Sequence, residues 1–274
     1  IDKSDIKSAV KTLKSNFLTQ GPVVIKFEKK LSKILKAKKT LCVSSGSAAL
    51  HIAAKTFGWK KDDKIISSPI TFIAGAAAIL HCGASLDFVD IDKNTYNIDP
   101  EKLENKLKND KKIKGVIVTD FAGQPANWSE LNYLKNKYKI NLINDNCHSF
   151  GSTYNNNSGY AAKYSDLSCL SFHPVKHITT GEGGAIVTNN SEIYEKCKLL
   201  RSHGIIKKKN FLPWYYEMQD LGFNYRLSDI HASIGLSQLD KLKKFINFRK
   251  KVAEKYDKIF REFSEIKTPF LDVN

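Results

Sequence analysis

The chain has 274 residues, of which 42% are hydrophobic and 26% are charged, and its formal net charge is +16. This length and balance are typical of a soluble globular protein with one large domain, or one domain and part of a second. No apolar run approaches the roughly 20 residues that span a bilayer, and the polar first residues contain no signal-peptide core. We therefore expect no membrane association.

Lysine carries most of the positive charge, because only four of the 44 basic residues are arginine. Proteins that read bases or bind phosphates bidentately favour arginine. The lysines are also spread along predicted helix faces, without a basic cluster interleaved with aromatic residues. We expect a solvated basic surface and no nucleic-acid partner, although a positive field can attract acidic substrates such as sugar nucleotides.

The cysteines are odd in number and never stand in a CxxC spacing; they are Cys42, Cys82, Cys147, Cys169 and Cys197. Neither a disulfide framework nor a metal site is expected from such a pattern. Free thiols favour a reducing compartment, so we expect the cytoplasm.

In chain order, apolar residues three or four positions apart first predict helices over residues 4–16 and 24–37. Short apolar strands then alternate with helices up to residue 201. The predicted strands are 40–43, 64–67, 85–89, 115–119, 140–144, 167–172 and 185–188. The predicted helices among them are 47–57, 74–81, 100–107, 129–138 and 191–201. From Leu227, one long amphipathic helix is predicted to reach about Phe263.

This alternation predicts an α/β fold with a mostly parallel central sheet flanked by helices. We expect residues 1–226 to form the large domain, with N-terminal helices within residues 1–38. Residues 227–274 are predicted to lead into a small C-terminal domain that is largely absent from this chain. The chain begins with Ile1 rather than methionine, so we also expect its natural N-terminus to be missing.

Lys176 and Asp145 are the candidate catalytic pair. Asp145 follows one apolar strand, and Lys176 follows another and precedes the glycine-rich segment ITTGEGG. Ligands of parallel sheets bind beyond the carboxyl ends of the strands, so both side chains are expected at one edge. Pyridoxal 5′-phosphate (PLP) chemistry needs such a pair, because a lysine amine forms the Schiff base and a carboxylate holds the pyridine nitrogen.

A phosphate site is predicted where the strand 40–43 meets the next helix. Gly46 lets the backbone approach an anion, the helix N-terminus supplies N–H groups, and Ser47 adds a hydroxyl. Ser171 is a second candidate hydroxyl, and Phe72 follows another strand of the same edge. Neither GxGxxG nor GxxxxGKS occurs, so a dinucleotide fold and a P-loop are not supported.

Several segments carry a family resemblance: SSGSAAL, PITFIAGAAAI, DNCHSFGS, SFHPVKHITTGEGGAIVTN and LGFNYRLSDIHASIGLSQL. They resemble the DegT/StrS-type nucleotide-sugar aminotransferases, which are PLP-dependent enzymes of fold type I. The resemblance runs from about Leu18 to about Phe263. Within the family, HPVKHITTGEGGA and WYYEMQDLGFNYR are most similar to the aminotransferases of pseudaminic acid synthesis, which act on a UDP-4-keto-6-deoxy-N-acetylhexosamine with L-glutamate as amino donor.

The resemblance implies a role for each matching residue. Lys176 would form the Schiff base and move the proton, and Asp145 would pair with the pyridine nitrogen. The remaining cofactor contacts would come from Gly46, Ser47 and Ser171 at the phosphate, Phe72 on the ring, His148 beside the 3-hydroxyl, and Asn224 at the phosphate of a partner subunit in a homodimer. The sugar would lie near Gln20, Gly21, Trp214 and Tyr215.

Three alternatives stay open on the sequence. Another nucleotide-sugar 4- or 3-aminotransferase of the family is one, and a PLP-dependent sugar dehydratase is another, although related dehydratases carry histidine in place of Lys176. A non-catalytic regulator that binds a sugar nucleotide or nucleic acid is the third. One departure from the family pattern is Asn144, which stands where the family usually has an acidic residue.

Overall fold

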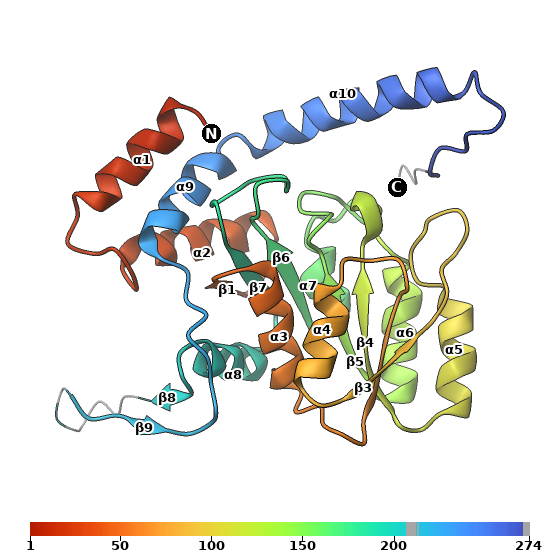
Figure 1. The fold of residues 1–274 in the computed structure, drawn as a ribbon, viewed down its shortest axis with the longest axis horizontal. Coiled ribbons are helices and arrows are strands. Elements are labelled where there is room, and N and C mark those ends of the chain that lie inside the picture. The colour runs from red at the N-terminus through yellow and green to blue at the C-terminus, as the bar shows by residue number, and fades with distance from the viewer. Residues whose placement is uncertain (207–211, 213, 271–274) are drawn as a thin grey trace.

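A computed structural model describes residues 1–206, 212 and 214–270 of the chain. Its centre is a seven-stranded sheet in the order β1-β7-β6-β5-β4-β2-β3 (Figure 1). The strands are β1 (Lys39–Val43), β2 (Lys64–Ser67), β3 (Ser85–Phe88), β4 (Ile113–Thr119), β5 (Asn141–Asp145), β6 (Leu167–Ser171) and β7 (Gly184–Thr188). All neighbouring strands pair in parallel except β7, which is antiparallel to both β1 and β6. The predicted α/β fold with a mostly parallel sheet is confirmed.

Helices cover both faces of this sheet. Their bounds are α1 (Lys3–Leu13), α2 (Pro22–Ile34), α3 (Gly46–Thr56), α4 (Ala74–His81), α5 (Pro100–Asn109), α6 (Trp128–Tyr138), α7 (Tyr160–Tyr164), α8 (Ser191–Arg201), α9 (Asp229–Leu239) and α10 (Leu242–Phe260). Alternate residues of a strand point to opposite faces, so Ile65 packs with α3, α4 and α8 while Ile66 packs with α5 and α6. Side chains of α2 and α9 complete the second face beside β1, β6 and β7.

The single long helix predicted from Leu227 is wrong, because the chain breaks between α9 and α10. Lys241 has a φ of −104°, well away from the helical value. Its amine lies 2.7 Å from Asp5 and 2.9 Å from Asp2, so contacts with α1 fix the break. Only Leu242 of α10 is buried, and Figure 1 shows this helix extending as an arm over the top of the sheet.

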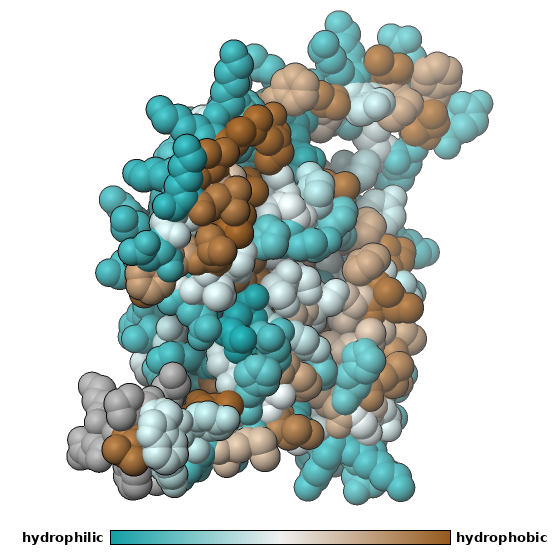
Figure 2. All heavy atoms as spheres, turned by 60° about the vertical axis from the view of Figure 1, so that its left-hand side comes forward, coloured by the Kyte–Doolittle hydropathy of each residue, from teal (hydrophilic) through white to brown (hydrophobic). Residues whose placement is uncertain are grey.

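Three small elements were not predicted. They are α7, the 3₁₀ turn η1 (Phe121–Gly123), and a hairpin of β8 (Ile205–Ile206) and β9 (Glu217–Met218), which projects at the lower left of Figure 1. Figure 2 shows a face in which hydrophilic side chains are spread over its whole height rather than gathered in one cluster. Among the described residues, no helix combines the length and apolar character that crossing a bilayer requires.

Candidate active site

A cleft of about 440 Å³ lies at the carboxyl edge of the sheet. It brings together side chains that follow β1, β5 and β6 and the start of α4. The lining residues are Ser45, Gly46, Ser47, Leu50, Phe72, Ala74, Asp145, Cys147, His148, Ser171, His173, Val175, Lys176 and Glu182. Every residue predicted to touch the cofactor within one subunit lines this one cleft.

One end of the cleft is built for an anion. Ser45 is the N-cap of α3, and its Oγ accepts the backbone N–H of Ala48 at 3.0 Å. The N–H groups of the first helical residues have no intrahelical partner and point out of the helix end. A Cβ on Gly46 would lie 2.8 Å from the Cβ of Ser171, so only glycine lets this helix end approach the serine so closely. The N–H groups of α3 and the hydroxyls of Ser47 and Ser171 therefore form a phosphate-sized donor set.

Asp145 is the last residue of β5 and is only 4% exposed. Its backbone carbonyl accepts the N–H of Asp120 at 3.2 Å, and its Oδ1 accepts the N–H of Cys147 at 3.2 Å. Both bonds hold the carboxylate in place at the edge of the cleft. A buried carboxylate in this position is suited to pair with a cationic or protonated group of a ligand.

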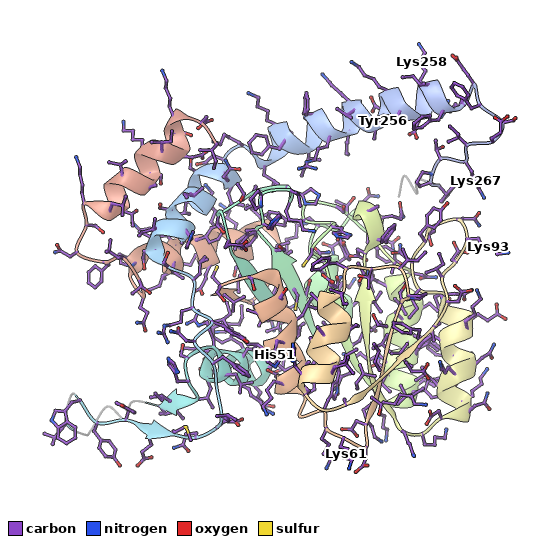
Figure 3. All side chains as sticks on the ribbon, viewed as in Figure 1. His51, Lys61, Lys93, Tyr256, Lys258 and Lys267 are labelled. Atoms are coloured by element: carbon purple, nitrogen blue, oxygen red, sulfur yellow. The ribbon has the colours of Figure 1, made fainter. Side chains whose placement is uncertain are left out.

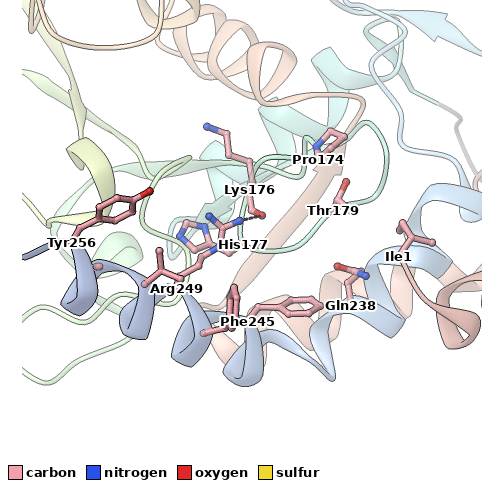
Figure 4. A pocket seen from close by; sticks show the side chains of 12 residues that line it. Ile1, Pro174, Lys176, His177, Thr179, Gln238, Phe245, Arg249 and Tyr256 are labelled. Atoms are coloured by element: carbon pink, nitrogen blue, oxygen red, sulfur yellow. Dashed lines mark hydrogen bonds between the residues drawn. The ribbon is translucent and has the colours of Figure 1, made fainter. Parts of the chain in front are cut away.

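Lys176 is half-buried on the loop between β6 and β7. Its backbone N–H donates to the carbonyl of His173 at 2.9 Å, which closes a turn. Arg249 of α10 donates to the carbonyls of Val175 and Lys176, both at 3.0 Å. In Figure 4 this backbone contact lies on one side of the loop, and the Lys176 side chain leaves on the other side. The amine is thus directed into the cleft by a loop held from behind.

His148 is half-buried and lines the same cleft as Lys176 and Asp145, and its ring meets the ring of Phe121 edge-on with the ring centroids 6.1 Å apart. Burial lowers the pKa of His148, the positive charge of Lys176 lowers it further, and Asp145 partly opposes both. The imidazole therefore favours its neutral form, in which one ring nitrogen donates and the other accepts. A neutral imidazole is suited to hydrogen-bond a ligand hydroxyl.

Four polar residues of the cleft are not among the site residues predicted from the sequence: Ser45, Cys147, His173 and Glu182. Burial and the neighbouring Asp145 raise the pKa of the Cys147 thiol well above its usual range. The thiol is therefore protonated and is not a nucleophile. Glu182 belongs to the GEGG segment, so its closeness to Lys176 in sequence was the signal that could have identified it.

The remaining predicted site residues lie outside the cleft of their own chain. Gly21 is the N-cap of α2, and its N–H donates to the buried carboxylate of Asp229 at 2.7 Å, with Gln20 just before it in the chain. Asn224 is exposed and forms a bridge with Ser202. Trp214 and Tyr215 lie between β8 and β9, and Trp214 is 71% exposed. Their roles toward a partner subunit or a sugar stay predictions.

A second cavity of about 590 Å³ lies between α10 and the loop that carries Lys176 (residues 172–183, here called the lysine loop), on the α10 side of that loop (Figure 4). His177 lines it, and its Nδ1 is buried without a hydrogen-bond partner among the described residues. Burial lowers the pKa of His177 from its ordinary 6.5 to about 4, and the charges of Arg249, Lys176 and His148 act in the same direction. His177 is therefore neutral in the folded protein at neutral pH.

This shift predicts a pH dependence of stability. The unfolded chain takes up a proton on His177 as the pH falls below about 6.5, whereas the folded chain does so only near 4. The free energy of unfolding should have its full value above about pH 6.5. It should fall as the pH is lowered from about 6.5 to about 4. Urea unfolding at about pH 7.5 and about pH 5 should show a larger loss for the wild type than for His177→Gln. Equal losses in the two proteins would contradict this assignment.

Comparison with known proteins identifies the family. A model of the DegT/DnrJ/EryC1/StrS aminotransferase family matches residues 1–273. The chain belongs to this family. The aminotransferase is 44% identical to a Campylobacter jejuni protein named UDP-4-amino-4,6-dideoxy-N-acetyl-beta-L-altrosamine transaminase. The alignment spans 271 residues and covers 97% of this chain and 70% of the relative.

Solved structures agree with this placement. Helicobacter pylori PseC, described as an aminotransferase involved in the biosynthesis of pseudoaminic acid, superposes with a TM-score of 0.89 at 35% identity, covering 96% of this chain and 70% of that one. A putative sugar aminotransferase from Streptococcus pneumoniae, solved in a PLP form and a PMP form, superposes with a TM-score of 0.87 at 28% and 29% identity, covering 95% of this chain and 70% of that one. The predicted family and fold are confirmed.

The cleft fits the cofactor of this family. PLP presents a phosphate, a ring nitrogen that takes a proton, and a carbonyl that reacts with an amine. The α3 N-terminus with Ser47 and Ser171 matches the phosphate, the buried carboxylate of Asp145 matches the nitrogen, and the amine of Lys176 matches the carbonyl. The aminotransferase is PLP-dependent.

Proposed function

We propose that this aminotransferase moves an amino group from L-glutamate to the C4 keto carbon of a UDP-4-keto-6-deoxy-N-acetylhexosamine, in pseudaminic acid or surface glycan biosynthesis. The observation that carries the chemistry is the meeting of Lys176 and Asp145 in one cleft beside an anion-binding helix end. The sugar rests on the 44% identity to the Campylobacter jejuni transaminase and on the likeness to PseC.

Each residue of the cleft has a distinct task in this proposal. Bound PLP supplies an electron sink for a carbanion, and the chain supplies position and proton transfer. Gly46, Ser47 and Ser171 hold the phosphate, and Asp145 keeps the proton on the ring nitrogen. Phe72 is 64% exposed at the mouth of the cleft, so its ring is free to cover one face of the cofactor.

Lys176 is the residue that transfers the proton. Its amine is a nucleophile toward a carbonyl when neutral, and once displaced it can take a proton from one carbon and return it to another. The Arg249 bonds to the backbone of Val175 and Lys176 keep the loop in position during this exchange. His148, neutral beside Lys176, orients the ring hydroxyl by a hydrogen bond.

The shared use of sites between subunits is also proposed. Asn224 is exposed and lies outside the cleft of its own subunit, which supports a role toward the phosphate of a partner subunit in a homodimer. Two exposed apolar side chains just before α4, Phe72 at the cleft and Ile73 next to it in the chain, support a partner on this side. Light scattering of the purified protein should give twice the mass of the chain. We also propose a cytoplasmic location, supported by five free cysteines.

An amino-transfer assay tests the proposed function. The protein is loaded with PLP, given L-glutamate, and then offered a panel of UDP-linked 4-keto and 3-keto sugars. The expected result is formation of 2-oxoglutarate in the first step and a 4-amino sugar in the second, with ping-pong kinetics. Product stereochemistry by NMR separates the pseudaminic substrate from those of other sugar aminotransferases of the family.

Other outcomes of this assay define the alternatives. Loss of a sugar hydroxyl without amine transfer would favour a PLP-dependent dehydratase. Binding of PLP without any amine transfer from L-glutamate would favour a regulator that binds a sugar nucleotide. Affinity for duplex DNA that falls steeply with salt would favour a nucleic-acid partner.

A further inference from the structure

A fully buried carboxylate lies directly behind the active site. Asp120 follows β4, is 0% exposed, and does not line the cleft. Its Oδ1 accepts the backbone N–H of Ala126 at 2.9 Å and the indole N–H of Trp128 at 2.8 Å. Its Oδ2 accepts four side-chain donors, listed with their distances: Asn144 at 3.2 Å, Asn146 at 2.9 Å, Ser149 at 3.0 Å and Tyr160 at 2.7 Å.

Three of the six donors come from the segment that carries Asp145. Asn144, Asn146 and Ser149 are at most 1% exposed and point to Asp120, whereas Asp145, Cys147 and His148 of the same segment line the cleft. The backbone N–H of Asp120 also donates to the carbonyl of Asp145 at 3.2 Å. Asp120 thus binds residues on both sides of Asp145 through its carboxylate, and Asp145 itself through its backbone N–H.

The six donors around Asp120 require a hydrogen-bond acceptor at this position. All six partners of Asp120 are neutral donors, and the amides, the indole and the backbone N–H have no lone pair aimed at it. An asparagine at this position would keep the shape but would place an NH₂ group against two other NH₂ groups or against the indole and backbone donors. Burial raises the pKa of Asp120 above its ordinary value, and the hydrogen bonds from Ala126, Tyr160, Trp128 and Ser149 act against that rise because they favour the ionised form.

We propose that Asp120 is a positioning residue that holds the segment 144–149 so that the Asp145 carboxylate and the His148 ring face the cofactor. This inference rests on the proposed function only in taking Asp145 as the partner of the ring nitrogen. Asp120 touches neither cofactor nor substrate and acts through Asp145.

The test is a double-mutant cycle read by PLP affinity of the apo-protein, measured by fluorescence titration. Asp120→Asn should weaken PLP binding roughly tenfold, the size of a lost charge-assisted hydrogen bond. In the Asp145→Asn background, adding Asp120→Asn should weaken PLP binding by less than about twofold, because the carboxylate that Asp120 positions is already absent. The PLP absorbance maximum of Asp120→Asn should also shift toward that of Asp145→Asn.

Asp166→Asn is the matched control. Asp166 accepts the backbone N–H of Leu142 at the other end of β5 at 2.8 Å and pairs with Lys135, so its loss affects the same strand without reaching the cleft. Thermal stability should fall in this control while PLP affinity stays the same. If Asp120→Asn does not fold, Ser149→Ala removes one donor and should give a smaller effect with the same non-additive pattern.

The outcomes separate the two claims. Equal losses from Asp120→Asn in the wild-type and Asp145→Asn backgrounds would overturn the positioning role and leave only a structural one. A wild-type protein that binds no PLP would instead overturn the proposed function.

Discussion

Lys176→Ala is expected to abolish amine transfer while leaving the fold intact. The amine is half-buried in the cleft, and no other lysine lines it among the described residues. A positioned side chain that transfers a proton contributes about 10²–10⁴-fold to a rate, and here the same amine is also the nucleophile. Turnover with L-glutamate should therefore fall by at least about 10³-fold. Borohydride reduction should fix PLP on Lys176 in the wild type and on no residue in the variant, as peptide mass spectrometry can determine.

Lys61→Ala is the control for this change. Lys61 is exposed at the opposite end of the sheet from the cleft, where Figure 3 labels it at the lower edge. It should keep full activity and the same borohydride label. Labelling of a different lysine in the wild type, or a Lys176→Ala protein with more than about one tenth of wild-type activity, would contradict the assignment.

The convergence of the site was predictable because it follows from the sheet. Lys176, Asp145 and Ser47 are far apart in sequence, but each follows a strand, and parallel strands end at the same edge. The cofactor residues predicted within one subunit therefore lie in one cleft. The local sequence around Lys176 does not by itself identify it as a site residue, because most of the forty lysines of the chain are expected on the surface.

The direction of β7 could have been predicted but was not. β6 and β7 are joined by residues 172–183, which contain no helix. A parallel pair usually needs a crossover helix, so a short connection without one favours an antiparallel pair. The antiparallel pair also explains the tight lysine loop, since both of its ends lie on adjacent strands.

The break between α9 and α10 could not be predicted in this way. No glycine or proline marks it, and the apolar period continues through it. The amine of Lys241 pairs with Asp2, the N-cap of α1, and with Asp5 in α1, more than two hundred residues away in the chain. Asp120 shows the same limit, because its donors are spread from Ala126 to Tyr160 and only the fold brings them together.

Asp145→Asn is expected to slow both half-reactions by about 10²-fold or more, because removing one partner of a buried charge pair costs about 3–5 kcal/mol. The carboxylate is 4% exposed, so water does not replace it as a partner of a protonated ring nitrogen. PLP should still attach to Lys176, because the amine and the phosphate donors remain. Single-turnover absorbance with L-glutamate, then with the keto sugar, measures each half-reaction separately.

The pattern of variants at this position distinguishes charge from shape. Asp145→Glu keeps the charge and should recover part of the rate, whereas Asp145→Ala should be no better than Asp145→Asn. The hydrogen bond from the Cys147 N–H to the Asp145 carboxylate can also be made to the asparagine side-chain oxygen, so Asp145→Asn should keep the local backbone and a nearly unchanged thermal midpoint. If Asp145→Asn reacts slowly but keeps its thermal stability, the lost rate is due to the missing negative charge. Activity of Asp145→Asn within about threefold of wild type would mean that the ring nitrogen has another partner.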